Sequence, residues 1–197
     1  MSEVTDSMPR RTGKRERLVD SATALVYRQG IERTTLAQVA ADADVPLGNV
    51  YYYFKSRDEL LRAVVDARLD EIRGFLSELD SVASPQARLR ALAQNWTTVA
   101  DDVVMYGCPI GSLTVELNKH LGGARECGPL LLREVVDWAA RQFRELGYAD
   151  AEVQAESLIA RIQGVALLAS AFHDRSLLER EFSSIERGIR APAKNAR

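Results

Sequence analysis

Three consecutive tyrosines, at positions 51–53, have the type and spacing of a surface cluster that could bind a ligand. Successive residues of a helix point about 100° apart, so the three rings cannot all face one core. At least one phenol must therefore lie in water, close to Lys55 and Arg57. Phenolic hydroxyls donate hydrogen bonds to phosphate, and their rings pack on sugars and thymine methyl groups. The cluster therefore favours contact with double-stranded DNA.

Neighbouring residues supply further groups suited to a nucleic acid. Asn49 can hydrogen-bond a base edge, Gly48 lets the backbone come close, and a helix N-terminus near Thr35 can hold a phosphate. The basic residues Arg10, Arg11 and Lys14 suit an arm that reaches an adjacent groove. The predicted DNA-binding residues are Thr35, Leu36, Leu47, Gly48, Asn49, Tyr51, Tyr52, Tyr53, Lys55 and Arg57.

The charge distribution agrees with this location. Residues 10–57 contain nine basic and five acidic side chains, a local net charge of +4. The whole chain carries −2, so the remaining residues carry −6. A basic segment on an acidic body is typical of a local polyanion site.

Two short helices position these residues. Thr35 and Gln38 form a capping box that starts a helix over residues 36–42. Pro46 suits the start of a second helix over residues 47–54. This is the spacing of a helix-turn-helix, in which the second helix lies in the major groove. The residues predicted to face its small core are Val39, Ala40, Val45, Val50 and Phe54.

The remaining residues repeat with helical period, so the chain is predicted to be all-α. Ser56 and Glu59 form a second capping box before a helix that reaches about residue 79. Further helices are predicted over about 85–103, 112–120, 129–146, 151–172 and 176–188, with a loop over 122–128. We expect a DNA-binding domain over 1–55 and a larger ligand-binding and dimerisation domain over 56–197.

The run LVDSATALVYRQGIERTTLAQVAADADVPLGNVYYYFKSRDELL, residues 18–61, resembles the N-terminal domain of TetR-family regulators. The resemblance implies a homodimer that binds a palindromic operator, usually as a repressor released by a small ligand. By position, Thr35, Tyr51, Tyr52 and Lys55 match phosphate contacts of the family. Leu47, Gly48, Asn49 and Tyr53 match base or groove contacts. Pro46-Leu47 and Tyr53 depart from common residues of the family, so no relative's operator can be transferred.

The segment YGCPIGSLTVEL, residues 106–117, is similar to a Gly-Cys-Pro-x-Gly-Ser-Leu signature of an LmrA/YxaF-like branch. That resemblance implies an aromatic or drug-like effector. A pocket for such a ligand is mostly apolar with a few polar groups. The predicted ligand-binding residues are Trp96, Val99, Met105, Tyr106, Cys108, Leu113, Leu117, Trp138, Gln163 and Phe172.

Apolar stripes on the two long helices near the C-terminus predict a dimer interface. Its residues are Leu131, Val135, Trp138, Gln142, Leu158, Ile162, Val165 and Ala169. Cys108 precedes a predicted helix, which leaves thiol-based redox sensing as an alternative trigger. His120 and His173 stand on separate helices without clustered carboxylates, so we expect neither a metal site nor a cofactor.

Other classes of protein fit the sequence less well. An all-α enzyme needs a nucleophile–base pair or a carboxylate dyad, and the sequence has no recognisable motif for either. A helical adaptor without DNA binding would carry acidic or bulky residues on the second short helix, where this chain has Asn49, the tyrosines and Lys55. Two cysteines without metal-ligand spacing suit a reducing cytoplasm. No apolar run predicts a membrane span or a signal peptide.

Overall fold

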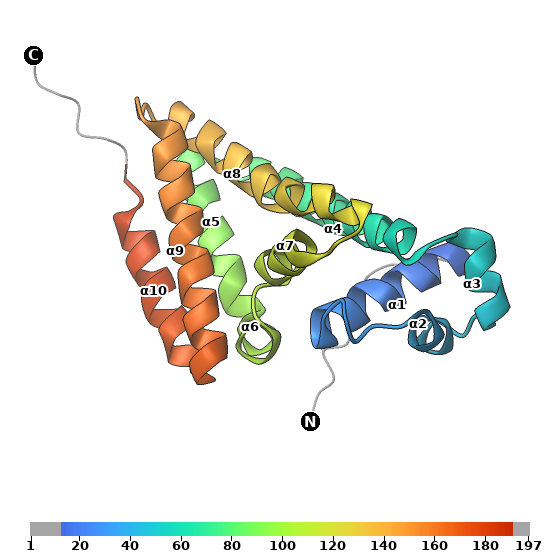
Figure 1. Ribbon diagram of the computed structural model, residues 1–197. Coiled ribbons are helices and arrows are strands. Elements are labelled where there is room, and N and C mark those ends of the chain that lie inside the picture. Colours follow the sequence, from blue (N-terminus) through green and yellow to red (C-terminus); the bar gives the residue numbers. More distant parts are fainter. Residues whose placement is uncertain (1–12, 191–197) are drawn as a thin grey trace, which may run out of the picture.

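The computed structural model describes residues 13–190, and this part of the chain consists of helices joined by turns, without strands, as predicted. Figure 1 shows α1, α2 and α3 grouped at one end of the molecule and α5, α9 and α10 at the other, with α4 and α8 running side by side between them. The helices are α1 Lys14–Gln29, α2 Leu36–Asp42, α3 Leu47–Tyr53, α4 Arg57–Asp80, α5 Pro85–Thr98, α6 Ala100–Tyr106, α7 Pro109–Lys119, the 3₁₀ helix η1 Gly123–Cys127, α8 Gly128–Glu145, α9 Ala151–Phe172 and α10 Arg175–Gly188.

Local sequence signals account for the group α1–α3. Gly30 ends α1 at a φ of 84°, a conformation that a residue with a Cβ rarely adopts. The Thr35 hydroxyl accepts the Gln38 N–H while the Gln38 side chain accepts the Thr35 N–H, so the predicted capping box forms. Val50 and Phe54 are fully buried. The predicted inward residues therefore do close a common core.

The start of α4 differs in one detail from the predicted capping box. Ser56 accepts the Glu59 N–H as expected. The Glu59 carboxylate, however, accepts the N–H of Lys55 at 2.7 Å instead of that of Ser56. It therefore ties the turn after α3 to the start of α4. Helix α4 packs on both α1 and α8, so it belongs to neither end alone. The domain boundary between residues 55 and 56 therefore stays a prediction.

Three predicted boundaries in the second half were wrong. The helix expected over 85–103 breaks at Val99, because α5 ends at Thr98 and α6 begins at Ala100. The helix expected from residue 112 begins at Pro109, since Pro suits the first turn and Cys108 Sγ caps it by accepting the Gly111 N–H at 3.2 Å. The expected loop over 122–128 contains η1.

Helix α9 has an unusual composition. By length and mean hydropathy, 1.3 over its most apolar window, it could cross a membrane, contrary to the expectation that no segment would. A packed core helix meets the same criteria, and α9 packs extensively on α8 and α10. Its remaining surface still carries exposed apolar side chains, among them Val153, Leu167, Leu168 and Phe172.

Candidate DNA interface and effector cavity

The outward surface of α3 carries most of the predicted DNA-binding residues. Tyr51 and Tyr52 are 54% and 76% exposed, and Leu47 is also exposed. Tyr53 is half-buried and meets the Tyr52 ring edge to face, with 5.1 Å between the ring centroids. Two of the three rings therefore face solvent, and the third, that of Tyr53, packs against the core and against Tyr52.

The other groups of this surface are open to different degrees. Gly48 is exposed, and a Cβ there would meet nothing within 4 Å, so the backbone is freely approachable. Asn49 and Leu36 are half-buried, whereas Thr35 is exposed at the start of α2. Lys55 donates to the Tyr51 and Tyr52 carbonyls at 3.1 and 3.4 Å, so its charge lies at the C-terminus of α3.

Arg57 is the predicted DNA contact with an internal role. Its side chain is half-buried, and its guanidinium donates to the Ile31 carbonyl oxygen, which joins the start of α4 to the turn after α1. Arg10 and Arg11 of the predicted arm lie outside the described residues, and Lys14 begins α1.

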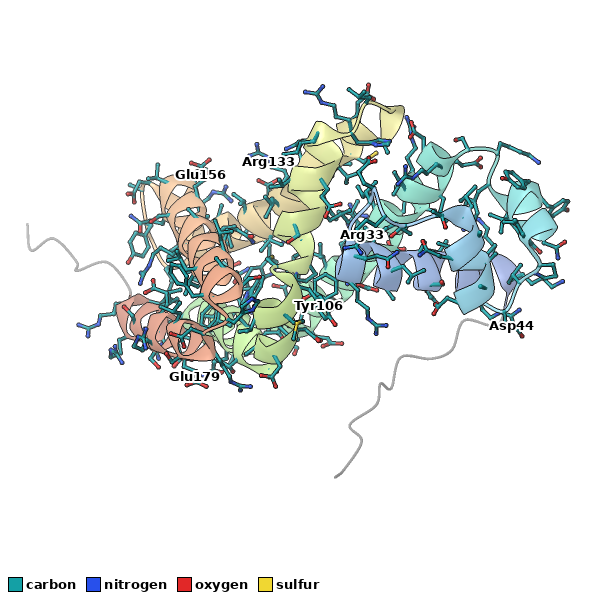
Figure 2. The ribbon with its side chains drawn as sticks, turned by 60° about the horizontal axis from the view of Figure 1, so that its bottom comes forward. Arg33, Asp44, Tyr106, Arg133, Glu156 and Glu179 are labelled. Carbon is teal, nitrogen blue, oxygen red and sulfur yellow. The ribbon has the colours of Figure 1, made fainter. Side chains whose placement is uncertain are left out.

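Several hydrogen bonds connect the group α1–α3 and the start of α4 to the rest of the molecule. Tyr27 of α1 donates to the Gly107 carbonyl at 3.0 Å, and the Ile31 N–H donates to the Glu116 carboxylate at 2.5 Å. Asp58 of α4 contacts His120 Nε2 at 2.7 Å. Figure 2 shows Tyr106, whose ring meets Tyr27, between the end that carries Asp44 and the end that carries Glu156.

A cavity of about 270 Å³ lies beside these junction contacts. Its walls come from α1, α4, α5, α6, α8 and α9 and from the start of α7, and they are mainly apolar. The lining residues are Tyr27, Arg68, Ile72, Phe75, Leu76, Leu92, Asn95, Trp96, Val99, Asp102, Pro109, Ile110, Leu132, Val135, Ile159, Ile162 and Gln163. An apolar cavity with a few polar groups is the usual form of a small-molecule site.

Of the predicted ligand-binding residues, Trp96, Val99 and Gln163 line this cavity. The structure places the others elsewhere. Met105 and Phe172 are exposed, and Tyr106 packs on Tyr27. Buried Trp138 donates to the Asp80 carboxylate at 2.9 Å. Cys108, Leu113 and Leu117 are buried in the interior without lining this cavity.

Sequence reasoning missed the walls contributed by α1 and α4, chiefly Tyr27 and Arg68. One signal was available for Arg68. It interrupts the apolar stripe of α4, in which Leu61, Val65 and Ile72 are buried at helical spacing. A charged residue in such a stripe needs a polar partner or a ligand.

The Cys108 thiol sits in an environment that disfavours the thiolate. Its side chain is 5% exposed, and burial raises the pKa of the thiol. Tyr27 is also kept protonated, because burial and the charge of Asp102 raise its pKa. Tyr27 can therefore serve as a hydrogen-bond donor, while Cys108 has little nucleophilic character.

All eight residues predicted for the dimer interface are at most 8% exposed within the single chain. The stripes on α8 and α9 face each other and the chain's own core, so they leave almost no surface for a partner. The exposed face of α8 is mostly charged, as at Arg133, Asp137 and Arg141. The exposed apolar side chains of α9 lie on the face of that helix opposite its buried stripe.

Among residues 13–190 no group of three or more histidine, cysteine or acidic side chains could hold a metal ion. His120 contacts Asp58, and His173 ends α9 in the left-handed conformation at a φ of 52°. Neither histidine therefore has the surroundings of a metal ligand.

Comparison with known proteins matches residues 18–64 to the family model described as bacterial regulatory proteins, tetR family. An HTH-type transcriptional regulator of Lactococcus lactis is 26% identical over 182 residues, which cover 87% of this chain and 91% of that protein. LmrA of Bacillus subtilis, also an HTH-type transcriptional regulator, is 25% identical over 163 residues, 79% of this chain and 85% of that protein.

Solved structures agree on the fold over nearly the full length. A TetR transcriptional regulator from Legionella pneumophila aligns with a TM-score of 0.82 and 19% identity, covering 92% of this chain and 100% of that one. The reduced form of E. coli NemR aligns with a TM-score of 0.80 and 21% identity over the same shares. At these identities the likeness shows the fold alone.

Proposed function

This chain is a DNA-binding transcriptional regulator of the TetR family, and we propose that it is a homodimeric repressor which a small molecule releases from a palindromic operator. The observation that carries the proposal is the position of Tyr27. This residue belongs to α1, which packs on the helix-turn-helix, and it also lines the cavity. A ligand in the cavity therefore touches the part of the chain that positions α3.

DNA binding is proposed to place α3 in the major groove. Tyr51 and Tyr52 then contact phosphates and sugars, with Lys55 close by, while Leu47, Gly48 and Asn49 approach the base edges. Phosphate neutralisation releases counterions, so the affinity for any DNA falls steeply with salt. The exposed tyrosines and Lys55 also argue against an adaptor that has lost DNA binding.

Dimerisation is proposed to use the exposed face of α9. Val153, Leu167 and Leu168 are exposed there, and the exposed Gly164 allows a close helix approach. A two-fold dimer through this face presents two α3 helices to one palindrome, with half-sites about 34–36 Å apart or a multiple of that distance. Burial in a dimer would also account for the apolar surface that α9 leaves exposed in the single chain.

Release is proposed to follow from a difference in ligand affinity between two arrangements of the dimer. The cavity is bounded by Tyr27 on α1, Arg68 on α4 and Ile110 on α7, which are the helices joined by the junction contacts. A ligand that prefers a different placement of α1 and α4 shifts the population toward dimers whose α3 helices no longer fit successive grooves.

Redox-triggered release through Cys108 is the weaker alternative. The thiol is buried, caps α7, and has a raised pKa, all of which slow reaction with peroxide. Cys108→Ser tests the alternative directly, because it would abolish release by peroxide and leave release by a ligand intact.

The first test is selection of DNA from a random library by the full chain at moderate salt. We expect the parent protein to enrich a palindrome, and Tyr52→Ala to enrich it more weakly. The selected duplex then serves in a screen for compounds that release it. The proposal would be contradicted if the parent protein enriched no sequence and gave the same result as Tyr52→Ala.

The dimer is tested separately by measuring mass in solution. Leu167→Glu places a charge on the exposed face of α9, and we expect it to yield monomers. Val115→Glu is the matched control, because Val115 is a similarly exposed apolar residue on α7. A Leu167→Glu variant that stays dimeric would exclude this face.

A further inference from the structure

Arg68 is the one basic residue that lines the cavity among residues 13–190. It stands in the apolar stripe of α4, and its side chain is 19% exposed. A guanidinium is always charged and offers five N–H donors. An arginine at this depth therefore needs several acceptors.

The chain supplies only part of what Arg68 requires. Its Nη1 donates to Glu71 Oε2 at 2.6 Å, one turn further along α4. Its Nε is shielded from solvent and has no hydrogen-bond partner. A buried donor without an acceptor destabilises the folded chain, so such groups in proteins call for an explanation.

The surroundings of Arg68 determine what kind of acceptor fits. Ile72, Phe75 and Trp96 provide apolar walls on which a ring or a short chain can pack. Arg68 is near enough to lower the pKa of both Tyr27 and Cys108, although burial raises each of them overall. Tyr27 gives its one hydroxyl proton to the Gly107 carbonyl, so it contributes its ring to the cavity wall and leaves Arg68 as the charged donor of this region.

We propose that the effector is a small apolar carboxylate whose anionic group binds Arg68. The inference rests on the proposed function, since it names the chemical class of the ligand that would act at this cavity. A carboxylate can accept two parallel N–H bonds from a guanidinium, which fixes its orientation as well as its position. In this proposal the ligand supplies the acceptor that Nε–H lacks, and the apolar part of the ligand lies among Ile72, Phe75 and Trp96.

Three acidic residues near Arg68 oppose an anionic ligand, namely Asp102, Glu71 and Glu116, the last of which lines a smaller cavity together with Arg68. Asp102 also lines the cavity, and although it is exposed, its charge reaches Tyr27 and raises the pKa of that phenol, so it also repels an anionic ligand. Glu71 competes with the ligand for Arg68. It is only about one-third exposed, at 32%, and does not line the cavity. A cationic ligand would have to desolvate its charge beside Arg68.

The test is calorimetric titration of the full chain with three compounds of the same ring system. The probes are 2-naphthoate, its primary amide 2-naphthamide, and the cation 2-naphthylmethylammonium. We expect the acid to bind about tenfold tighter than the amide, or more, because one charge-assisted pair contributes at least that factor. We expect the cation to bind more weakly than either.

Two variants locate the preference at Arg68. Arg68→Met keeps an unbranched side chain that reaches about as far as Nε and removes the charged guanidinium group, so acid and amide should bind equally. Glu71→Gln removes the competing carboxylate, so it should strengthen binding of the acid and leave the amide unchanged. The second variant keeps Arg68 in place, so the proposal is still tested if Arg68→Met does not fold.

Each outcome decides one question. Equal binding of acid and amide by the parent, tighter binding of the cation, or no binding of the acid would each overturn the carboxylate proposal. Retention of the acid preference by Arg68→Met would do the same. If the acid binds through Arg68 but no DNA is released, the ligand class stands and the repressor proposal fails. If only neutral or cationic compounds release DNA, the repressor stands and the ligand class fails.

Discussion

The two ends of this molecule use their residues in opposite ways. At the end formed by α1–α3, the side chains proposed to function point outward from a short helix, while Val50 and Phe54 beneath them fill a closed core. In the body, the proposed site is a cavity between helices, and some of its walls, such as Ile162 and Leu92, are also core residues. Function and stability are therefore separable at the DNA-binding end and coupled in the body.

The largest effect is expected for an interior residue of the body that does not line the cavity. Trp138→Ala removes a fully buried ring and its bond to Asp80, which should lower the free energy of unfolding by about 3–5 kcal/mol. Chemical denaturation measures this loss. The naphthoate affinity of the folded variant should stay unchanged.

Trp96→Ala provides the contrast to Trp138→Ala, because Trp96 does line the cavity. It should weaken ligand binding as well as stability. If Trp138→Ala altered ligand affinity as much as Trp96→Ala does, the cavity would have to extend to α8 at Trp138.

At the DNA-binding end, substitutions should change function with little effect on stability. Tyr51→Ala and Tyr52→Ala should each weaken operator binding by about 1–3 kcal/mol, the loss expected for a hydrogen bond to a charged phosphate. Their unfolding free energies should stay within about 0.5 kcal/mol of the parent, because both side chains are exposed. Equilibrium binding at fixed salt measures the operator affinity of both variants, and chemical denaturation measures their stability.

Tyr53→Ala tests the limit of this separation. Tyr53 is half-buried and packs against the core, so its loss should lower stability as well as DNA affinity. A variant with unchanged stability would mean that Tyr53 contributes only to the DNA surface.

The same contrast explains how much of the structure the sequence could predict. Residues 36–42 and 47–53 lie in helices fixed by neighbouring signals, the Thr35 cap and Pro46, and those signals act within one turn. The outward placement of Tyr51 and Tyr52 then follows from helical geometry. These features are local, so the sequence predicted both short helices, but it did not predict that Tyr53 is half-buried while Tyr51 and Tyr52 are exposed.

The cavity could not be predicted in this way, because its walls meet only in the folded chain. Tyr27 and Gln163 both line it, although they lie far apart in the sequence. Trp138 and Leu117 have the composition of pocket residues, yet they fill the core. Likewise, the apolar stripe of α9 identified a packed surface, but helical period alone did not reveal whether that surface packs on the same chain or on a partner.

A smaller effect is expected where the two ends meet. Tyr27→Phe removes the hydrogen bond to the Gly107 carbonyl, which should lower stability by about 1 kcal/mol. The ring still lines the cavity and still packs on Tyr106, so ligand affinity should change little. The ratio of operator affinities without and with ligand should fall, because one connection between cavity and α1 is lost. An unchanged ratio would show that the coupling runs through α4 and α7 instead.

The smallest effect is expected from Asp58, and it depends on pH. The hydrogen bond to His120 holds the pKa of this carboxyl below its ordinary value of 3.8, and the Gly123 N–H acts in the same direction. Because the pKa is lower in the folded chain, the stabilisation is fully present above pH 3.8 and is lost as the pH falls through the folded value. Asp58→Asn should therefore reduce stability at neutral pH, and its stability should fall less steeply than that of the parent below pH 3.8. Acid denaturation of parent and variant measures both effects.

Asp174→Asn is the matched control, since the pKa of Asp174 is also lowered, but by Ser176 within the same end of the molecule. Only Asp58→Asn should also change operator affinity, because only Asp58 joins α4 to the segment after α7. If both variants changed operator affinity equally, the contact between Asp58 and His120 would not couple the two ends of the molecule.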